Sequence, residues 1–244
     1  MSKKDITLVF DEEKCVGCGM CAKDCPAGCF DISDGKAHLK NGFCLYCGHC
    51  EAVCSQHALH FEGYDDELLE FTETPRVDPD SLLDALKARR SVRHFDKKPV
   101  EKEKIEKIIE AGRITPTAVN RQGTSFVVLN EEIDKYERIA LKTFPGNHKP
   151  GFFFKGAPLA IVIISSDTVS ASLAASNMAL MSEALGLGVF YSGYYTMATK
   201  LSKKLRKTFG LNKKNKVVTT LVIGYPGVKY YRSAHRNAAN IKWF

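Results

Sequence analysis

Eight of the nine cysteines fall into two runs that share one spacing. Each run follows the pattern C-x₂-C-x₂-C-x₃-C, and every cysteine of the second run lies 29 residues after its counterpart in the first. The first quartet is Cys15, Cys18, Cys21 and Cys25, and the second is Cys44, Cys47, Cys50 and Cys54. A segment of about 60 residues buries little apolar surface, so whatever these thiols bind must stabilise its fold.

The spacing resembles that of two-cluster bacterial ferredoxins, in which the fourth cysteine of each run ligates the other cluster. The resemblance implies one 4Fe–4S cluster held by Cys15, Cys18, Cys21 and Cys54. The other cluster would be held by Cys44, Cys47, Cys50 and Cys25. Such clusters carry single electrons at low potential.

Other uses of the cysteines fit less well. Zinc sites generally use separated C-x₂-C pairs or cysteine mixed with histidine. Disulfides require an oxidising compartment, and Met1–Asp5 lacks the apolar region of a signal peptide, so we expect a cytoplasmic protein. Cys29 stands outside both runs and matches Ala58 in the repeat, which predicts a small buried residue.

Charge and composition divide the chain. Residues 1–64 carry a net charge of −3, whereas the remainder carries +10. We expect a two-cluster module at 1–64, a polar linker at 65–80 and a second domain at 81–244. No apolar run reaches the roughly 20 residues that span a membrane. The basic surplus lacks a nucleic-acid-binding motif, which favours a bound phosphate and acidic partners instead.

Hydrophobic periodicity predicts the elements of the second domain. Helices are expected to begin at Ser81 and to cover 99–111, 131–144 and 170–187, with Gly112 ending the second. Strands are expected at 125–129, 157–165, 189–191 and 217–224. In the first module, Asp34-Gly35 predicts a hairpin turn.

Four motifs in the second domain occur in a recognisable order. They are Arg89-Arg-Ser-Val-Arg93, Pro116-Thr-Ala-x-Asn120-x-Gln122, Glu183-Ala-Leu-Gly-Leu-Gly188 and Ile223-Gly-Tyr-Pro226. Taken alone, the arginine run could bind phosphate or complement a helix dipole. Together the motifs resemble the nitroreductase family of FMN-dependent flavoproteins over residues 81–236. With the first module, the chain resembles the ferredoxin-fused nitroreductases of anaerobes.

The resemblance implies an α+β fold: a two-cluster ferredoxin-like module, then a nitroreductase-type α+β sandwich in an intertwined homodimer with FMN at the interface. It assigns Arg89, Arg90 and Ser91 to the phosphate and ribityl end, and Arg93 to the N1/O2 edge of the flavin. The loop that reaches the flavin from the partner subunit would comprise Pro116, Thr117, Ala118, Asn120 and Gln122. Tyr191, Ser192 and Gly193 would lie by the N5/O4 edge. Arg232 and Arg236 are alternative candidates for a closing phosphate contact.

These features predict an FMN-dependent oxidoreductase, with no protein nucleophile. Electrons from a low-potential donor, a ferredoxin-like protein or NAD(P)H, would pass through the two clusters to FMN. The acceptor would be a nitroaromatic, a quinone or another conjugated molecule. Ser192 replaces the glutamate of many relatives, which weakens the expectation of direct NAD(P)H use. The alternatives are another flavin reaction, such as dehalogenation or enoyl reduction, and a non-catalytic electron-transfer flavoprotein serving a partner.

Overall fold

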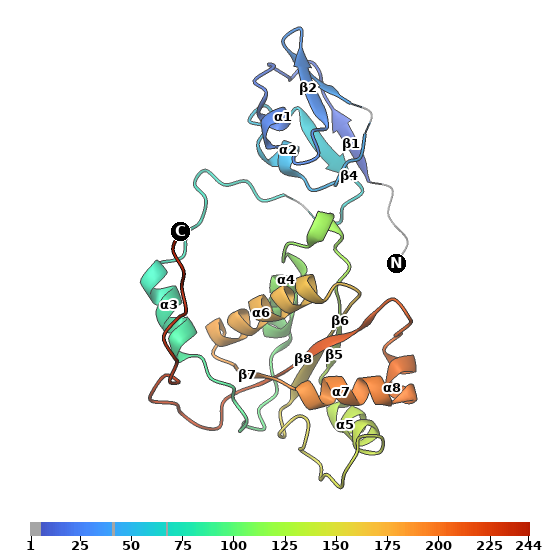
Figure 1. Ribbon diagram of the computed structural model, residues 1–244, viewed down its shortest axis with the longest axis vertical. Helices are drawn as coiled ribbons and strands as arrows, with labels where there is room; N and C mark the ends of the chain where they lie inside the picture. Colours follow the sequence, from blue (N-terminus) through green and yellow to red (C-terminus); the bar gives the residue numbers. More distant parts are fainter. Residues whose placement is uncertain (1–5, 41, 67) are drawn as a thin grey trace. The chain divides into compact units, whose positions relative to one another are not determined.

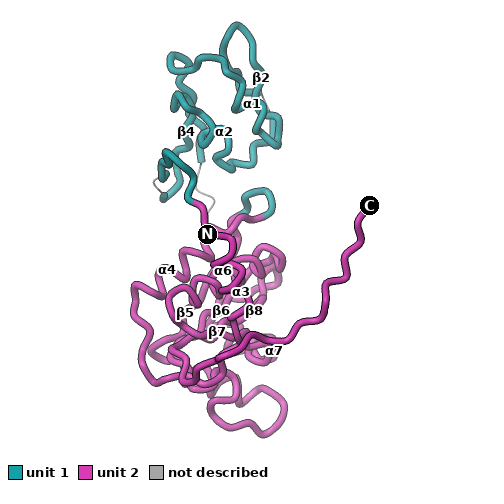
Figure 2. The backbone as a smooth tube through the Cα atoms, turned by 90° about the vertical axis from the view of Figure 1, so that its left-hand side faces the viewer, with its two compact units in different colours: residues 1–75, 118–121 teal, residues 76–117, 122–244 magenta. Residues whose placement is uncertain are grey.

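The computed structural model describes residues 6–40, 42–66 and 68–244. The chain forms two compact units (Figure 2), one of residues 1–75 with 118–121 and one of residues 76–117 with 122–244. The boundary at Pro75 falls inside the segment expected to be a linker. The expectation for Met1–Asp5 concerns residues outside the described part of the chain.

The first unit repeats one small pattern twice. Its elements are β1 (Thr7–Phe10), α1 (Met20–Asp24), β2 (Phe30–Ser33), β3 (Lys36–Leu39), α2 (His49–Ala52) and β4 (Leu59–Glu62). β1 pairs antiparallel with β4, and β2 with β3. α1 and α2 each begin after a glycine with positive φ, Gly19 at 75° and Gly48 at 77°. The 29-residue sequence repeat is therefore a structural repeat.

The predicted hairpin turn joins β2 to β3. Asp34 and Gly35 have φ values of 50° and 73°, as a two-residue turn of the type I′ kind requires. The core beside it is small, with Phe30 and Leu59 as its largest buried apolar residues. Buried cysteines complete this core, so the thiols contribute to packing as well as to any metal site.

The second unit is built on a four-stranded antiparallel sheet (Figure 1). Its strands are β5 (Ser125–Leu129), β6 (Leu159–Ser165), β7 (Gly188–Tyr191) and β8 (Lys216–Gly224), in the order β5-β6-β8-β7. All seven residues of β6 are buried. Leu159, Ile161 and Ile163 pack on one side of the sheet, and alternate residues from Ala160 pack on the other. Both faces are covered, which explains the continuous apolar run.

Helices form the two outer layers of this unit. They are α3 (Pro79–Ala88), α4 (Lys102–Arg113), α5 (Ile133–Leu141), α6 (Thr168–Ala184), α7 (Gly193–Leu201) and α8 (Lys203–Thr208). α4 and α6 pack together over one face, whereas α5, α7 and α8 cover the other (Figure 1). α3 has no buried residue. The expected α+β class, with an antiparallel sheet flanked by helices, is confirmed. None of the described helices is long and apolar enough to cross a membrane.

Several predicted helix ends were wrong. α4 begins at Lys102 and not at 99, α5 covers Ile133–Leu141 and not 131–144, and α6 covers Thr168–Ala184 and not 170–187. α3 starts two residues before Ser81, because Asp78 accepts a hydrogen bond from Ser81 N at 2.8 Å and Pro79 occupies the first helical position. Gly112 does not end α4, which continues through Arg113. A Cβ on Gly112 would lie 2.6 Å from the sulfur of Met178, so this glycine allows α4 to approach α6.

Candidate functional site

The eight repeat cysteines surround two separate pockets in the first unit. One pocket is lined by Cys15, Cys18, Cys21 and Cys54. The other is lined by Cys25, Cys44, Cys47 and Cys50. Each pocket therefore takes three thiols from one run and the fourth from the other run, which is the crossed partition expected from the sequence.

Backbone amides are already directed at four of these sulfurs. Cys15 Sγ accepts from Ala37 N at 3.4 Å, and Cys44 Sγ accepts from Tyr46 N at 3.3 Å. At equivalent places in the repeat, Cys25 Sγ accepts from Cys29 N and Cys54 Sγ from Ala58 N, both at 3.3 Å. Such bonds orient a ligating thiolate and stabilise its charge.

The thiols of the two pockets do not form single-ion sites among the described residues. Around one zinc ion, thiolate sulfurs lie about 4 Å apart. Among the described residues, no three metal-ligating side chains converge closely enough to hold one ion. Burial raises the pKa of Cys50 to about 12, so a thiolate there needs positive charge from bound iron. The two pockets thus suit a group with a volume of its own, such as a 4Fe–4S cube.

Cys29 behaves as its place in the repeat predicts. Its side chain is buried, and its Sγ donates to Phe43 O at 3.5 Å. Burial is the main cause that raises the pKa of this thiol, to about 11. Ala58, its repeat counterpart, is buried as well.

The arginine-rich segment of the second unit, residues 89–93, is hydrogen-bonded to β7. Ser91 forms a parallel bridge with Val189, and Val92 N donates to Val189 O at 3.2 Å. Gly188 makes this contact possible, because a Cβ there would lie 2.5 Å from Val92 Cγ2. Val92 is buried, whereas Ser91 and Arg93 on either side of it are exposed. One edge strand therefore carries both this segment and the predicted flavin residues 191–193.

The next residues of the segment pair with the chain leaving β8. Asp96 N donates to Tyr225 O and Gly227 N donates to His94 O, each at 2.9 Å. A Cβ on Gly224 would lie 2.7 Å from the ring of Pro158. Two of the four sequence motifs thus owe their glycines to close packing around the arginine-rich segment. Both glycines belong to motifs recognised in the sequence, but the sequence did not indicate that they allow close packing.

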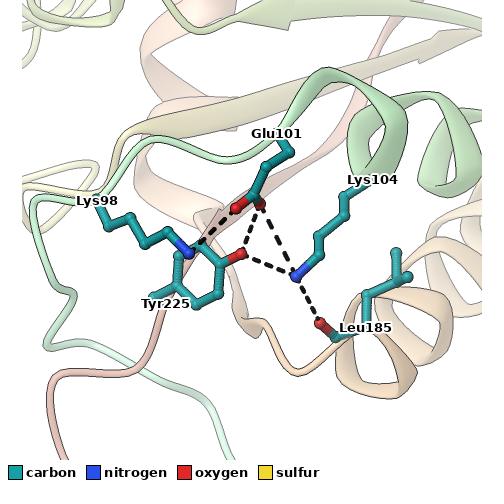
Figure 3. Close-up of polar contacts among 5 residues, drawn as sticks. All are labelled: Lys98, Glu101, Lys104, Leu185 and Tyr225. Carbon is teal, nitrogen blue, oxygen red and sulfur yellow. Dashed lines mark hydrogen bonds and ion pairs between the residues drawn. The ribbon is translucent and has the colours of Figure 1, made fainter.

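A polar network holds Tyr225 in place (Figure 3). Its hydroxyl accepts from Lys104 Nζ at 2.8 Å and donates to Glu101 Oε2 at 2.5 Å. Lys104 Nζ also donates to Leu185 O at 3.2 Å, just after α6. Lys98 Nζ lies 3.1 Å from Glu101 Oε1. The network joins the start of α4 to the end of α6 and to the turn that follows β8.

The first two arginines of the segment are available to bind an anion. Arg89 and Arg90 are half-buried, and neither forms an ion pair with a described residue. Arg90 lies 5.7 Å from the centre of the Tyr230 ring. Burial raises the pKa of Glu183, an effect that Arg89 opposes, and Glu183 Oε1 is buried without a partner among the described residues. Half-buried arginines that form no ion pair with a described carboxylate fit an anionic ligand. Glu183 was not among the predicted site residues, although it begins one of the four sequence motifs.

The predicted N5/O4 segment leads into α7. Burial raises the pKa of Tyr191, and its hydroxyl donates to Ala175 O at 3.3 Å. Ser192 is buried and its Oγ donates to Phe153 O at 2.9 Å, so its hydroxyl is engaged inside the protein. Gly193 begins α7, and a Cβ there would meet nothing within 4 Å. Ser192 N donates to Thr220 O at 2.8 Å, so of these two residues only the exposed Gly193 has a backbone amide left for a ligand.

The loop at 116–122 is not brought to the arginine-rich segment by any described contact within the chain. Pro116 precedes Thr117, whose Oγ1 accepts from Gln122 N at 2.9 Å. Ala118 begins a short 3-10 turn that ends at Asn120. Residues 118–121 group with the first unit, where Asn120 Nδ2 donates to Tyr46 O at 2.5 Å. Asn120 and Gln122 both adopt a φ of 48°, an unusual value outside glycine.

The basic tail approaches the end of α3. Arg236, Ser233 and Ala234 line a pocket together with Leu86 and Lys87. Leu86 and Lys87 lie on α3, just before the arginine-rich segment in the sequence. Arg232 is exposed and does not line that pocket. Of the two alternatives, Arg236 is therefore the one that shares a pocket with α3, the helix that leads into Arg89.

In comparisons with known proteins, each of the two parts of the chain matches a family model. The model described as the nitroreductase family matches residues 86–225, and the model described as the 4Fe-4S dicluster domain matches residues 7–55. A candidate NADH dehydrogenase/NAD(P)H nitroreductase of Methanothermobacter thermautotrophicus is 28% identical over 160 residues, covering 62% of this chain and 80% of that protein.

Solved structures extend the likeness to the fold. An FMN-dependent nitroreductase of Clostridium difficile R20291 is 28% identical with a TM-score of 0.50, over 63% of this chain and 91% of that one. A nitroreductase with bound FMN from Bacteroides fragilis, 19% identical with a TM-score of 0.58 over 67% of this chain and 98% of that one, has the same fold. The chain belongs to the nitroreductase family and carries a 4Fe–4S dicluster ferredoxin domain at its N-terminal side, which makes it an oxidoreductase.

Proposed function

We propose that this oxidoreductase uses FMN to reduce nitroaromatics, quinones or similar conjugated acceptors, with electrons relayed through two 4Fe–4S clusters. The observation that carries the proposal is the pair of half-buried arginines, Arg89 and Arg90, which lack a described acidic partner. They adjoin a segment fixed to β7, the strand that ends at the predicted flavin residues. The same chain carries the two thiol-lined pockets.

The residues present fit an FMN. Arg89, Arg90 and Ser91 would hold the phosphate and ribityl end, because guanidinium forks donate paired hydrogen bonds to phosphate oxygens. Arg93 would stabilise negative charge at the N1/O2 edge. The backbone amide of Gly193 would donate at the N5/O4 edge, and Arg236 would close over the phosphate. FMN is named for the relative from C. difficile and is bound in the one from B. fragilis, which supports extending it to this chain.

The residues of the first unit fit two clusters. Cys15, Cys18, Cys21 and Cys54 would ligate one, and Cys25, Cys44, Cys47 and Cys50 the other. When bound, the clusters supply one-electron steps and the flavin supplies hydride or two-electron reduction. The chain binds and orients these groups, and its amides and Arg93 tune their charge.

Exposed apolar side chains support a homodimer. α3 presents Leu83 and Leu86, each 49% exposed, and the long apolar helix α6 presents Leu173 at 52%. α7 adds Met197 at 50%. Large apolar side chains grouped on several helices are typical of an interface. In such a dimer, the 116–122 loop of one protomer would complete the flavin site of its partner.

Cofactor analysis tests the proposal directly. The purified, reconstituted protein should hold about eight irons, matching sulfide, and about one FMN per chain. Arg89→Ala should lose FMN while keeping its iron, because only the phosphate contact is removed. Lys135→Ala, at an exposed position paired with Glu132 at the start of α5, is the matched control and should keep both. Equal flavin content in Arg89→Ala and the control would contradict the assignment of the arginine-rich segment.

A further inference from the structure

The C-terminal quarter of the chain has no acidic residue. All 28 Asp and Glu lie at or before Glu183. Seven lysines and one arginine fall between positions 200 and 216, and we call them the basic patch. The patch consists of Lys200, Lys203, Lys204, Arg206, Lys207, Lys213, Lys214 and Lys216. Its members lie at the end of α7, along α8 and in the turn that leads into β8.

The patch is a fixed surface of the second unit. Arg206 is half-buried and the other seven members are exposed. Leu205 and Phe209 anchor α8 in the core, where both are buried. The following turn is held by Asn212, whose Oδ1 accepts from Lys214 N at 2.7 Å, and by Asn215, whose Oδ1 accepts from Asn212 N at 2.8 Å. The charges are thus presented on ordered backbone.

The lysines of the patch that lie on α8 destabilise this helix. Lys203 and Lys204 occupy the first turn of α8, at the positive end of the helix dipole, where an acidic residue would stabilise. Lys203 and Lys207 are four residues apart, and like charges at that spacing repel. Local rules broken without a compensating contact are expected mainly at functional sites.

Several lysines elsewhere in the second unit are paired with acids, whereas none of the patch lysines is paired with a described one. Lys87 pairs with Asp84, Lys102 with Glu106, and Lys135 with Glu132. No patch cation forms an ion pair with any acid in the described part of the chain. A solvated face usually mixes both signs of charge. The patch instead forms a field of one sign, of the kind that steers an oppositely charged partner.

We propose that the basic patch is the docking surface for a small acidic electron-carrier protein that supplies this enzyme with electrons. The inference rests on the proposed function and names the partner and its surface. A protein is favoured over a nucleic acid because seven of the eight cations are lysines and the only aromatic residue between positions 200 and 216 is the buried Phe209. Single-stranded nucleic acids are bound by exposed aromatic side chains between the cations.

The place of the patch suits direct delivery to the flavin, a second entry for electrons besides the relay through the two clusters. α7 connects Gly193, in the predicted flavin segment, to the first patch lysine. At about 1.5 Å per residue, its nine residues span roughly 13 Å. Each encounter oxidises the carrier by one electron and reduces the holoenzyme by one. Two encounters supply the pair of electrons that reduction of the acceptor consumes, with protons taken from water.

Charge reversal in the holoenzyme tests the inference. The variant Lys203→Glu/Lys204→Glu/Lys207→Glu is compared with Lys97→Glu/Lys107→Glu/Lys142→Glu, which changes net charge equally at exposed lysines outside the patch. Stopped-flow reduction uses a reduced, acidic two-cluster ferredoxin at low and high salt. We expect the patch variant to be reduced at least about tenfold more slowly at low salt and to lose its salt dependence. The control should change by less than about twofold.

Two further arms separate the possible failures. Reduction by photoreduced deazaflavin, a donor without a protein surface, should be equal in all variants. Equal rates of the two triple variants with ferredoxin would overturn the docking surface, even if the enzyme reduces its acceptors normally. The inference is also overturned if the patch variant loses binding to an oligonucleotide or anionic vesicles while ferredoxin rates stay unchanged. Failure of the deazaflavin-reduced enzyme to reduce any acceptor would instead count against the proposed function.

Discussion

Gly188 shows how a single missing Cβ can shape a cofactor site. The residue lies where the arginine-rich segment crosses β7, and any side chain would meet Val92. The nearest contact, 2.5 Å, is shorter than real Cβ atoms tolerate. Since Val92 is buried, it cannot swing into solvent. The strain must therefore move the backbone on which Ser91 and Arg93 are carried.

We predict that Gly188→Ala lowers flavin affinity more than it lowers stability. Overpacking of this kind costs about 1–3 kcal/mol, which a folded domain tolerates, but the arginines would be displaced. The measurements are flavin content after purification and the thermal unfolding midpoint. Gly42→Ala, where the added Cβ meets nothing within 4 Å, is the control. Normal FMN content in Gly188→Ala would show that the close approach does not position the arginines.

Cys25 and Cys29 are four residues apart and have opposite expected roles. Both line the pocket formed by the second run, but Cys25 belongs to the repeated ligand spacing, whereas Cys29 is buried in the core outside both runs. We predict that Cys25→Ser damages the cluster held by Cys44, Cys47 and Cys50 and spares the other. Cys29→Ala, which copies Ala58 in the repeat, should retain about eight irons.

Iron analysis and electron paramagnetic resonance of the reduced variants measure this difference. If Cys25→Ser instead disturbs the cluster of Cys15, Cys18 and Cys21, ligation follows each run separately and the crossed partition is incorrect.

At the scale of elements, the network around Tyr225 ties three segments together (Figure 3). The hydrogen bond from Tyr225 is the largest cause that lowers the pKa of Glu101, to about 2, with Lys98 contributing. A carboxylate whose pKa is lower in the folded state stabilises the fold above its unfolded pKa, 4.5 for this group. That contribution is lost as the pH falls from there through 2.

We predict that Tyr225→Phe is less stable than wild type at pH 6 and that the gap narrows as the pH falls below 4.5. The variant loses the bond that favours ionised Glu101, so less of its stability depends on that charge. Differential scanning calorimetry of the second unit's transition at several pH values gives the gap directly. Tyr231→Phe, at a tyrosine that is 78% exposed, should differ little from wild type at any pH. A gap independent of pH would exclude Glu101 as its source.

Sequence periodicity was most informative where an element is regular. It predicted β5 with both ends correct, and β6 as a buried strand, because uninterrupted apolar runs have few other uses. It misplaced the start of α3, since Ser81 and Asp78 are both good caps and only the fold selects between them. Glu137 shows a further limit. Its buried carboxylate accepts from the backbone of Gly151, Phe153 and Phe154, a contact between distant segments that no local pattern indicates.

The candidate site was predictable to a similar degree. The resemblance to two-cluster ferredoxins predicted which thiols line a common pocket, whereas the local spacing alone does not indicate that the fourth thiol comes from the other run. The arginine-rich segment was recognisable, but the reason for its position was not. Val189 and Tyr225, which hold it, lie far along the chain. That the 116–122 loop reaches the flavin of a second protomer stays a prediction.

At the scale of the whole molecule, charge separates the two parts of the chain as clearly as structure does. The first module is acidic and the remainder strongly basic. The small core of the first unit includes buried cysteines, so we expect iron to stabilise it as a metal stabilises other small domains. The second unit has a two-sided apolar core of its own and does not need that support.

The central claim is that one chain stores electrons on clusters and flavin and delivers them to a conjugated acceptor. Anaerobic reoxidation of the fully reduced holoenzyme by a nitroaromatic or a quinone, with the electrons counted from the absorbance of both cofactors, tests it most directly. We predict that about four electrons per chain pass to the acceptor, two from FMN and one from each cluster. Flavin that reoxidises while the clusters stay reduced, or neither cofactor reoxidising with any acceptor, would contradict the account.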